Sequence, residues 1–98
     1  FDKETTIKLK EFMERLDNIY LSLDIDVLDP EIAPGTGYLE PEGMKFEDLK
    51  NVLKEILNNK VKRIDLVEIN PSKDIDDKTV NVGEEIVRYI TASQFKEI

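Results

Sequence analysis

Between Ile19 and Pro30 the chain reads Ile-Tyr-Leu-Ser-Leu-Asp-Ile-Asp-Val-Leu-Asp-Pro, and this stretch decides the fold. From residue 19 to residue 27, apolar side chains occupy every second position, which is the pattern of a strand with one buried face. Proline cannot continue a ladder of backbone hydrogen bonds, so the strand has to end by Asp29. We therefore predict a strand over Ile19–Val27, with Asp24 and Asp26 together on its other face.

The regions on both sides of this strand carry other patterns. Apolar residues recur at helical spacing before the strand, in the middle of the chain and near its end. Pro and Gly are concentrated in a long loop directly after the strand, and such loops are often functional. The expected elements are a helix over Lys3–Asp17 with Asp2 as N-cap, a loop over Pro30–Gly43, a helix over Lys45–Asn58, a strand over Val61–Ile69, a turn over Ser72–Lys78, and a last helix with Thr79 as N-cap and Ile90 on its inner face.

Together these elements follow the order α-β-α-β-α. Two strands that are joined through a helix form a right-handed crossover and pair in parallel. Two parallel strands alone leave both edges of their sheet unpaired, so the sheet has to continue with strands from elsewhere. We therefore predict an α/β fold in which residues 1–98 form a single fragment, the C-terminal part of a three-layer α/β/α sandwich.

The composition limits the possible partners. The 98 residues include 22 Asp and Glu against 14 Lys and Arg, for a net charge of −8, so neither nucleic acid nor a membrane is an expected partner. Cysteine is absent, which fits a reducing compartment, and we expect a cytoplasmic protein. Histidine is also absent, so an imidazole base or ligand would have to come from outside these residues.

Asp24 and Asp26 are the first candidates for a functional site. On one strand face their backbones would lie roughly 6–7 Å apart, and α/β sheets bind ligands at the carboxyl ends of parallel strands. Two carboxylates there could hold one divalent ion, or one carboxylate could bridge a pair of ions. A simpler interpretation stands beside this one, because a chain with 22 acidic residues contains an Asp-x-Asp pair by chance.

Longer motifs extend this pair. Ser22-Leu-Asp-Ile-Asp-Val-Leu-Asp-Pro30 is followed by Ala33-Pro-Gly-Thr-Gly37, and later by Asp65-Leu-Val-Glu-Ile-Asn-Pro71 and by Thr79. In this order the motifs resemble the second metal-binding signature, the next strand and the start of the last helix of the ureohydrolase family. That family contains arginases, agmatinases, formimidoylglutamases and guanidinobutyrases. The resemblance extends over about residues 19–90.

The resemblance implies a manganese-dependent hydrolase that releases urea from a cationic guanidinium substrate. It implies that Asp24 bridges two manganese ions, that Asp26 binds one of them, and that Asp29 supports the ligands or the loop without binding metal. Glu68 would hold the guanidinium group, and a surface salt bridge is the simpler alternative for this residue. Two divalent ions lower the pKa of a water that bridges them, so that hydroxide forms near neutral pH and attacks the guanidinium carbon.

The sequence departs from the family pattern in two ways. Tyr38, Leu39 and Glu42 replace a small residue, a proline and a glycine of the family's loop, which bears on substrate specificity. The family's Gly-Gly-Asp-His and Asp-Ala-His-x-Asp motifs, which supply the other metal ligands, are absent from this sequence. We therefore expect a fragment that is inactive alone and that needs the N-terminal part of the same fold. Family members commonly form trimers or hexamers, which implies a homo-oligomer here.

Several interpretations stay open. The sequence of the motifs favours agmatine as the substrate, with arginine or a guanidino acid as alternatives. A haloacid-dehalogenase-type phosphatase also has an apolar strand that ends in Asp-x-Asp, as in Leu23–Leu28, with magnesium as cofactor. That family usually continues with Gly-Thr-Leu, whereas Asp29 and Pro30 follow here. The last alternative is a structural or oligomerisation segment without catalytic activity.

Overall fold

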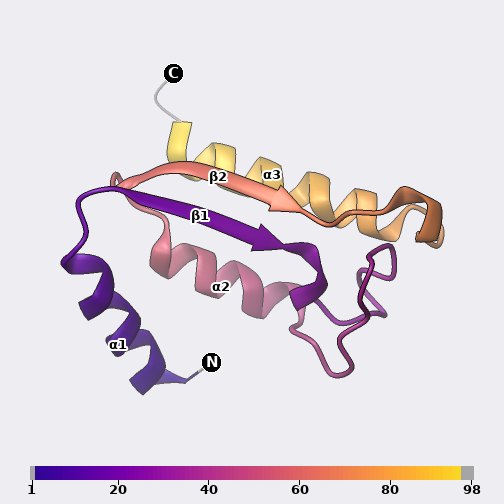
Figure 1. The fold of residues 1–98 in the computed structure, drawn as a ribbon, viewed down its shortest axis with the longest axis horizontal. Coiled ribbons are helices and arrows are strands. Elements are labelled where there is room, and N and C mark those ends of the chain that lie inside the picture. The colour runs from indigo at the N-terminus through magenta and orange to yellow at the C-terminus, as the bar shows by residue number, and fades with distance from the viewer. Residues whose placement is uncertain (1, 96–98) are drawn as a thin grey trace.

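A computed structural model describes residues 2–95 of the chain, and its elements follow the predicted α-β-α-β-α order (Figure 1). None of the described helices combines the length and apolar composition that crossing a membrane requires. The elements are α1 (Lys3–Glu14), β1 (Ile19–Asp24), the 3-10 turn η1 (Ile25–Val27), α2 (Phe46–Ile56), β2 (Val61–Val67), the 3-10 turn η2 (Pro71–Lys73) and α3 (Lys78–Phe95).

The two strands β1 and β2 form a parallel pair, which confirms the predicted α/β class. Leu21 lies opposite Ile64 and Leu23 lies opposite Leu66, so one face of the pair is apolar. Within residues 2–95 the sheet has no third strand, and the outer edge of each strand is unpaired there. Both strands point towards the loop-rich end of the molecule, where their carboxyl ends lie side by side (Figure 1).

The core lies on one face of the sheet, against helices α2 and α3. The opposite face carries Tyr20, Ser22, Arg63 and Val67, all of them exposed. The described residues therefore form the sheet and one helical layer of the three layers that the sequence predicted. The buried core consists of Leu23, Ile25 and Leu28 on and after β1, Ala33 in the loop, Leu49 and Leu53 of α2, and Val82, Ile86 and Ile90 of α3.

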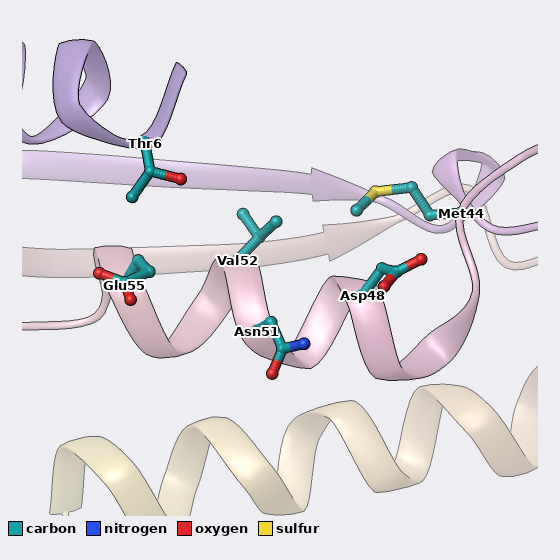
Figure 2. Close-up of a pocket in the computed structure, with 6 residues that line it drawn as sticks. All are labelled: Thr6, Met44, Asp48, Asn51, Val52 and Glu55. Atoms are coloured by element: carbon teal, nitrogen blue, oxygen red, sulfur yellow. The ribbon is translucent and has the colours of Figure 1, made fainter. Parts of the chain in front are cut away.

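Helix α1 begins as predicted and lies beside α2. The carboxylate of Asp2 accepts a hydrogen bond from the backbone N–H of Thr5 at 2.8 Å, which makes Asp2 the N-cap. An ion pair between Lys10 and Glu55, with an N–O distance of 2.6 Å, connects the two helices. A cavity of about 320 Å³ between them is lined by Thr6, Met44, Asp48, Asn51, Val52 and Glu55 (Figure 2).

Strand β1 ends earlier than the sequence predicts. It stops at Asp24, whose carboxylate accepts a hydrogen bond from the backbone N–H of Asp26 at 2.9 Å, and the chain then turns through η1. The turn still buries Ile25 completely, so the apolar alternation continues beyond the strand. The prediction that Asp24 and Asp26 share a strand face is therefore wrong, because only Asp24 belongs to the strand.

Strand β2 also ends early, at Val67. The next residue, Glu68, has a φ of 72°, a left-handed conformation that interrupts a strand. The prediction of a strand that continues through Glu68 to Ile69 is therefore wrong. Glu68 instead occupies the first position after the strand.

Helix α3 starts at Lys78, so Thr79 lies in its first turn and is not the predicted N-cap. The carboxylate of Asp74 accepts hydrogen bonds from the backbone N–H groups of Thr79, at 2.9 Å, and Val80, at 3.1 Å. First-turn N–H groups have no acceptor within their own helix, so Asp74 performs the capping that was predicted for Thr79.

Candidate functional site

The candidate residues gather where the two parallel strands end. Asp24 is the last residue of β1 and lies opposite Val67, the last residue of β2, so Glu68 follows at the same edge of the sheet. Asp26 lies in η1, directly after β1. Open α/β sheets bind ligands at the carboxyl ends of their strands, so this edge is the natural place for a site.

The carboxylates at this edge repel one another. Burial raises the pKa of Asp26 above its ordinary value, and hydrogen bonding to Asp24 raises it further. The negative charges of Asp24, Glu40 and Glu68 act on Asp26 in the same direction. Because all of these groups are acidic, a cation bound among them would offset their repulsion.

Glu40 is a residue of this cluster that the sequence analysis did not select. It is exposed in the loop between η1 and α2, and its negative charge contributes to the raised pKa of Asp26. No periodic pattern extends over this loop, and its path is set by contacts with residues that are distant in the sequence. The sequence around Glu40 therefore does not indicate that this residue lies near Asp26.

Glu68 is held in an uncommon conformation beside the same loop. A left-handed non-glycine residue carries strain on the order of 1–3 kcal/mol unless it is Asn or Asp, so its neighbours have to hold it in place. A Cβ atom added to Gly37 would lie 3.9 Å from Oε2 of Glu68, which places the loop backbone close to the carboxylate. Tyr38 and Leu39 follow Gly37 and are 60% and 52% exposed. The loop backbone at Gly37 therefore lies beside the Glu68 carboxylate.

The loop is anchored at Gly35. Its backbone N–H donates to Oγ1 of Thr79 at 2.7 Å, and its carbonyl accepts from the backbone N–H of Asn70 at 2.7 Å. A Cβ atom at Gly35 would lie only 2.9 Å from Cβ of Asp74, so a larger residue does not fit there. The next residue, Thr36, is 3% exposed, and within the described part of the chain its hydroxyl has no hydrogen-bond partner.

Asp29, which the sequence places in a supporting role, makes its hydrogen bonds within the loop. Its Oδ1 accepts from the backbone N–H of Glu31 at 2.9 Å, and its own N–H donates to the carbonyl of Met44 at 2.9 Å. The N–H of Met44 donates in turn to the carbonyl of Val27 at 2.8 Å, so the two ends of the loop are joined. These bonds fix the chain where it leaves η1.

Asp24 and Asp26 fit part of a metal site. Carboxylate oxygen is a suitable ligand for hard divalent ions such as manganese and magnesium. Among residues 2–95, however, no group of three or more Asp, Glu, His or Cys side chains is placed to hold a metal ion. The residues that line the cavity of Figure 2 include neither Asp24 nor Asp26. The described residues therefore provide some of the ligands of a metal site and not the complete set.

Comparisons with known proteins agree with the motifs. The model of the arginase family matches residues 2–92. Arginase 1, mitochondrial, of Oryza sativa subsp. indica is 39% identical over 92 residues, covering 93% of this chain and 26% of the rice protein. The agmatinase of Halalkalibacterium halodurans is also 39% identical, over 89 residues, covering 87% of this chain and 31% of that protein. The crystal structure of Helicobacter pylori arginase aligns with a TM-score of 0.81 at 32% identity, covering 93% of this chain and 32% of that one.

These similarities identify the family without selecting one substrate, because an arginase and an agmatinase are equally similar at 39% identity. The chain spans about a quarter to a third of the length of these relatives. The family match extends over nearly the whole chain, so the phosphatase alternative has no remaining support. The chain belongs to the arginase family.

Proposed function

We propose that this chain is the part of a manganese-dependent ureohydrolase that supplies Asp24 and Asp26 to a two-metal site and Glu68 to the substrate's guanidinium group. The observation that carries the proposal is the position of these carboxylates at the adjoining ends of two parallel strands. The family match supports hydrolase chemistry. In the proposed reaction, water attacks the guanidinium carbon, the bond to the alkyl nitrogen breaks, and that nitrogen leaves protonated as the amine while urea is released.

Each carboxylate has a role that suits its location. Asp24, fixed at the start of η1, would bridge the two ions, and Asp26 would bind one of them. Two manganese ions bound there would supply an activated water near neutral pH. Glu68 would accept charge-assisted hydrogen bonds from the guanidinium group, which keeps the reacting carbon oriented.

The remaining ligands would come from the N-terminal part of the same fold. Within residues 2–95, the outer edges of β1 and β2 are unpaired and one sheet face has no helices over it. Parallel sheets are usually covered on both faces. The missing part would supply the histidines that this sequence lacks. A trimer or hexamer and a cytoplasmic location stay predictions.

Agmatine is the substrate that we favour over arginine or a guanidino acid. The loop segment after Gly37 contains Glu40 and Glu42, both exposed, and no basic residue up to Gly43. The negative charges of Glu40 and Glu42 favour the ammonium end of agmatine and disfavour the carboxylate that arginine and guanidino acids carry. The exposed apolar surface of Tyr38 and Leu39 suits the aliphatic chain of the substrate.

The test uses the full-length protein that contains these residues, supplied with manganese. Urea release is measured with agmatine, arginine and 4-guanidinobutyrate, and agmatine is expected to give the highest kcat/KM. Asp24→Asn removes a proposed ligand and should lower kcat/KM by at least about 100-fold, because replacing even a residue that only supports a metal ligand costs about 10- to 100-fold. Glu31→Gln, at an exposed acidic residue of the same loop, is the matched control and should leave kcat/KM unchanged.

Two results would contradict the proposal. If the full-length protein released no urea from any of these substrates, the structural or oligomerisation alternative would be favoured. The absence of a third metal ligand among residues 2–95 is the observation behind that alternative. If the isolated residues 1–98 released urea, the chain would not be a partial site, because it would act without added histidines.

A further inference from the structure

We infer that Thr79 is a positioning residue for Glu68 and acts on it through Gly35 of the loop. The inference rests on the proposed function, in which Glu68 holds the guanidinium group. Thr79 is not one of the proposed ligands, and it lies in α3, beyond η2 in the sequence. Its contribution is to fix the loop backbone against residues 68–70.

Glu68 needs support from outside its own segment. A non-glycine residue stays in the left-handed region only where the surrounding structure holds it there. After Glu68, the side chain of Ile69 packs so closely against α3 that a Cβ atom on Gly83 would lie 2.7 Å from its Cδ1. The backbone N–H of Asn70 then donates to the carbonyl of Gly35 at 2.7 Å. The loop is therefore one of the two supports that follow Glu68.

Residues 35–37 and residues 68–70 lie side by side and run in opposite directions. Gly35 is hydrogen-bonded to Asn70, and Gly37 faces Glu68, with 3.9 Å between its added Cβ position and Oε2 of Glu68. Gly35 has no room for a Cβ atom, which would lie 3.0 Å from the carbonyl oxygen of Asn70, so glycine at this position allows the close approach. A shift of Gly35 would therefore move both the Gly37 backbone beside the Glu68 carboxylate and the carbonyl group that holds Asn70.

Thr79 holds Gly35 from the other side. Its Oγ1 accepts the hydrogen bond from the Gly35 N–H at 2.7 Å, and because Thr79 is 0% exposed, this bond is shielded from water. The backbone of Thr79 is itself fixed by Asp74, whose two carboxylate oxygens accept from its N–H at 2.9 and 3.1 Å. Removing the hydroxyl would leave a buried N–H without its acceptor, and the loop would have to move to satisfy it.

The test compares Thr79→Val, which keeps the shape and removes the hydroxyl, with Thr79→Ser, which keeps the hydroxyl, in the full-length enzyme. Thr79→Val should raise KM for the guanidinium substrate about tenfold, with kcat lowered less than about threefold, as expected for the loss of one buried hydrogen bond that orients the substrate-binding group. Thr79→Ser should restore KM to within about twofold of the wild type. Thr91→Val, at an exposed threonine of the same helix, is the control.

A purely structural role for Thr79 gives a different result. Loss of stability alone lowers the folded fraction of the enzyme, which reduces the apparent kcat and the Tm but leaves KM unchanged. That outcome would overturn the inference. In a Glu68→Gln background, Thr79→Val should change KM by less than about twofold, because the group that it positions is already altered. A full tenfold rise in that background would also overturn it.

Hydrogen exchange separates this inference from the proposed function. If the wild type releases no urea, the proposed function fails, but the exchange rates of the amide protons still decide the role of Thr79. Thr79→Val should accelerate exchange at Gly35 and Asn70, whose N–H groups donate to Thr79 and to Gly35, while the amides shared between β1 and β2 stay protected. Unchanged exchange at those two residues would overturn the inference whatever the activity.

Discussion

Gly35 and Gly37 belong to the same loop but have opposite steric surroundings. A Cβ atom at Gly35 would lie 2.9 Å from Cβ of Asp74 and 3.0 Å from the carbonyl oxygen of Asn70, whereas at Gly37 the nearest atom is 3.9 Å away. Neither glycine has a positive φ, so backbone strain does not separate them. Gly35→Ala should lower the free energy of unfolding by about 1–3 kcal/mol through overpacking.

Gly37→Ala is the matched control for this prediction, because the added methyl group would make only an ordinary contact with Glu68. Its effect on the free energy of unfolding should stay within about 0.5 kcal/mol. Both values are measured by denaturant unfolding of the full-length protein. Equal destabilisation by the two substitutions would mean that the close contacts at Gly35 do not limit the loop.

Asp74 should make stability depend on pH. Burial alone would raise the pKa of its carboxyl group, but hydrogen bonds from the backbone N–H groups of Thr79 and Val80 outweigh burial and hold the pKa below its usual value of 3.8. Folding therefore favours the ionised form, so this stabilisation is complete above about pH 4 and is lost as the pH falls through the lower folded-state pKa. We therefore expect this contribution to the free energy of unfolding to be lost only below about pH 4.

The measurement is the difference in Tm between the wild type and Asp74→Asn at several pH values. The wild type should have the higher Tm at pH 7, and the difference should shrink as the pH falls below about 4, where the wild-type carboxylate becomes protonated. Comparing two variants removes the contributions of the other acidic groups. A difference in Tm that stayed constant down to pH 2 would show that the charge of Asp74 does not cap α3.

At the scale of the elements, the sequence predicts which segments are regular and fails at the strand ends. Apolar alternation predicts a strand over Ile19–Val27, but hydrogen-bonded pairing stops at Asp24. Alternation reports which side chains are buried, and Ile25 is buried in η1 as it would be in a strand. The end of β2 is hidden for another reason, because the left-handed residue there is Glu68 rather than a glycine.

The N-terminus of α3 shows how a capping residue can be misassigned. Thr79 has a suitable side chain, but its hydroxyl bonds to Gly35 of the distant loop. Asp74 reaches the first turn from five residues before Thr79, because Asp76 and Asp77 between them adopt left-handed conformations. Sequence-based capping rules consider the residues next to the helix, so they do not find an acceptor supplied across such a turn.

The residues of the candidate site also divide into those that the sequence identifies and those that it does not. Asp24, Asp26 and Glu68 could be selected because they lie in ordered motifs, and the structure places them at the same edge of the sheet. Glu40 could not be selected, and Thr79 was selected only as an N-cap, since the contributions of both to the site depend on how the loop folds back. The loop path is fixed by contacts between residues as far apart as Gly35 and Thr79, and local patterns contain no information about such contacts.

At the scale of the whole molecule, the sheet face without helices carries three polar side chains that are paired with one another. Arg63 lies 3.5 Å from the carboxylate of Asp65, and its guanidinium group lies 5.1 Å from the ring centroid of Tyr20. The hydroxyl of Tyr20 also donates a hydrogen bond to Asp65. The polar groups of Tyr20, Arg63 and Asp65 therefore have partners on this face, whereas within residues 2–95 the backbone groups along the outer strand edges have none.

These unpaired edges give the prediction that tests the proposed completion of the fold. In the isolated chain, amide protons of β1 and β2 that point away from the other strand are exposed to water and should exchange rapidly. In the full-length protein, additional strands would bond to them and slow their exchange by about 100-fold or more. Mass spectrometry or NMR of both proteins measures these rates.

The amides between β1 and β2 serve as the internal control, because they are paired in both proteins if the isolated chain is folded. Rapid exchange at these amides would show an unfolded chain, and the comparison would then be made in the full-length protein alone. Slow exchange at the inner amides with rapid exchange at the outer ones, in the full-length protein, would show that no strands join this sheet. The carboxylates at its edge would then lack the neighbouring strand ends from which the missing histidine ligands are proposed to come.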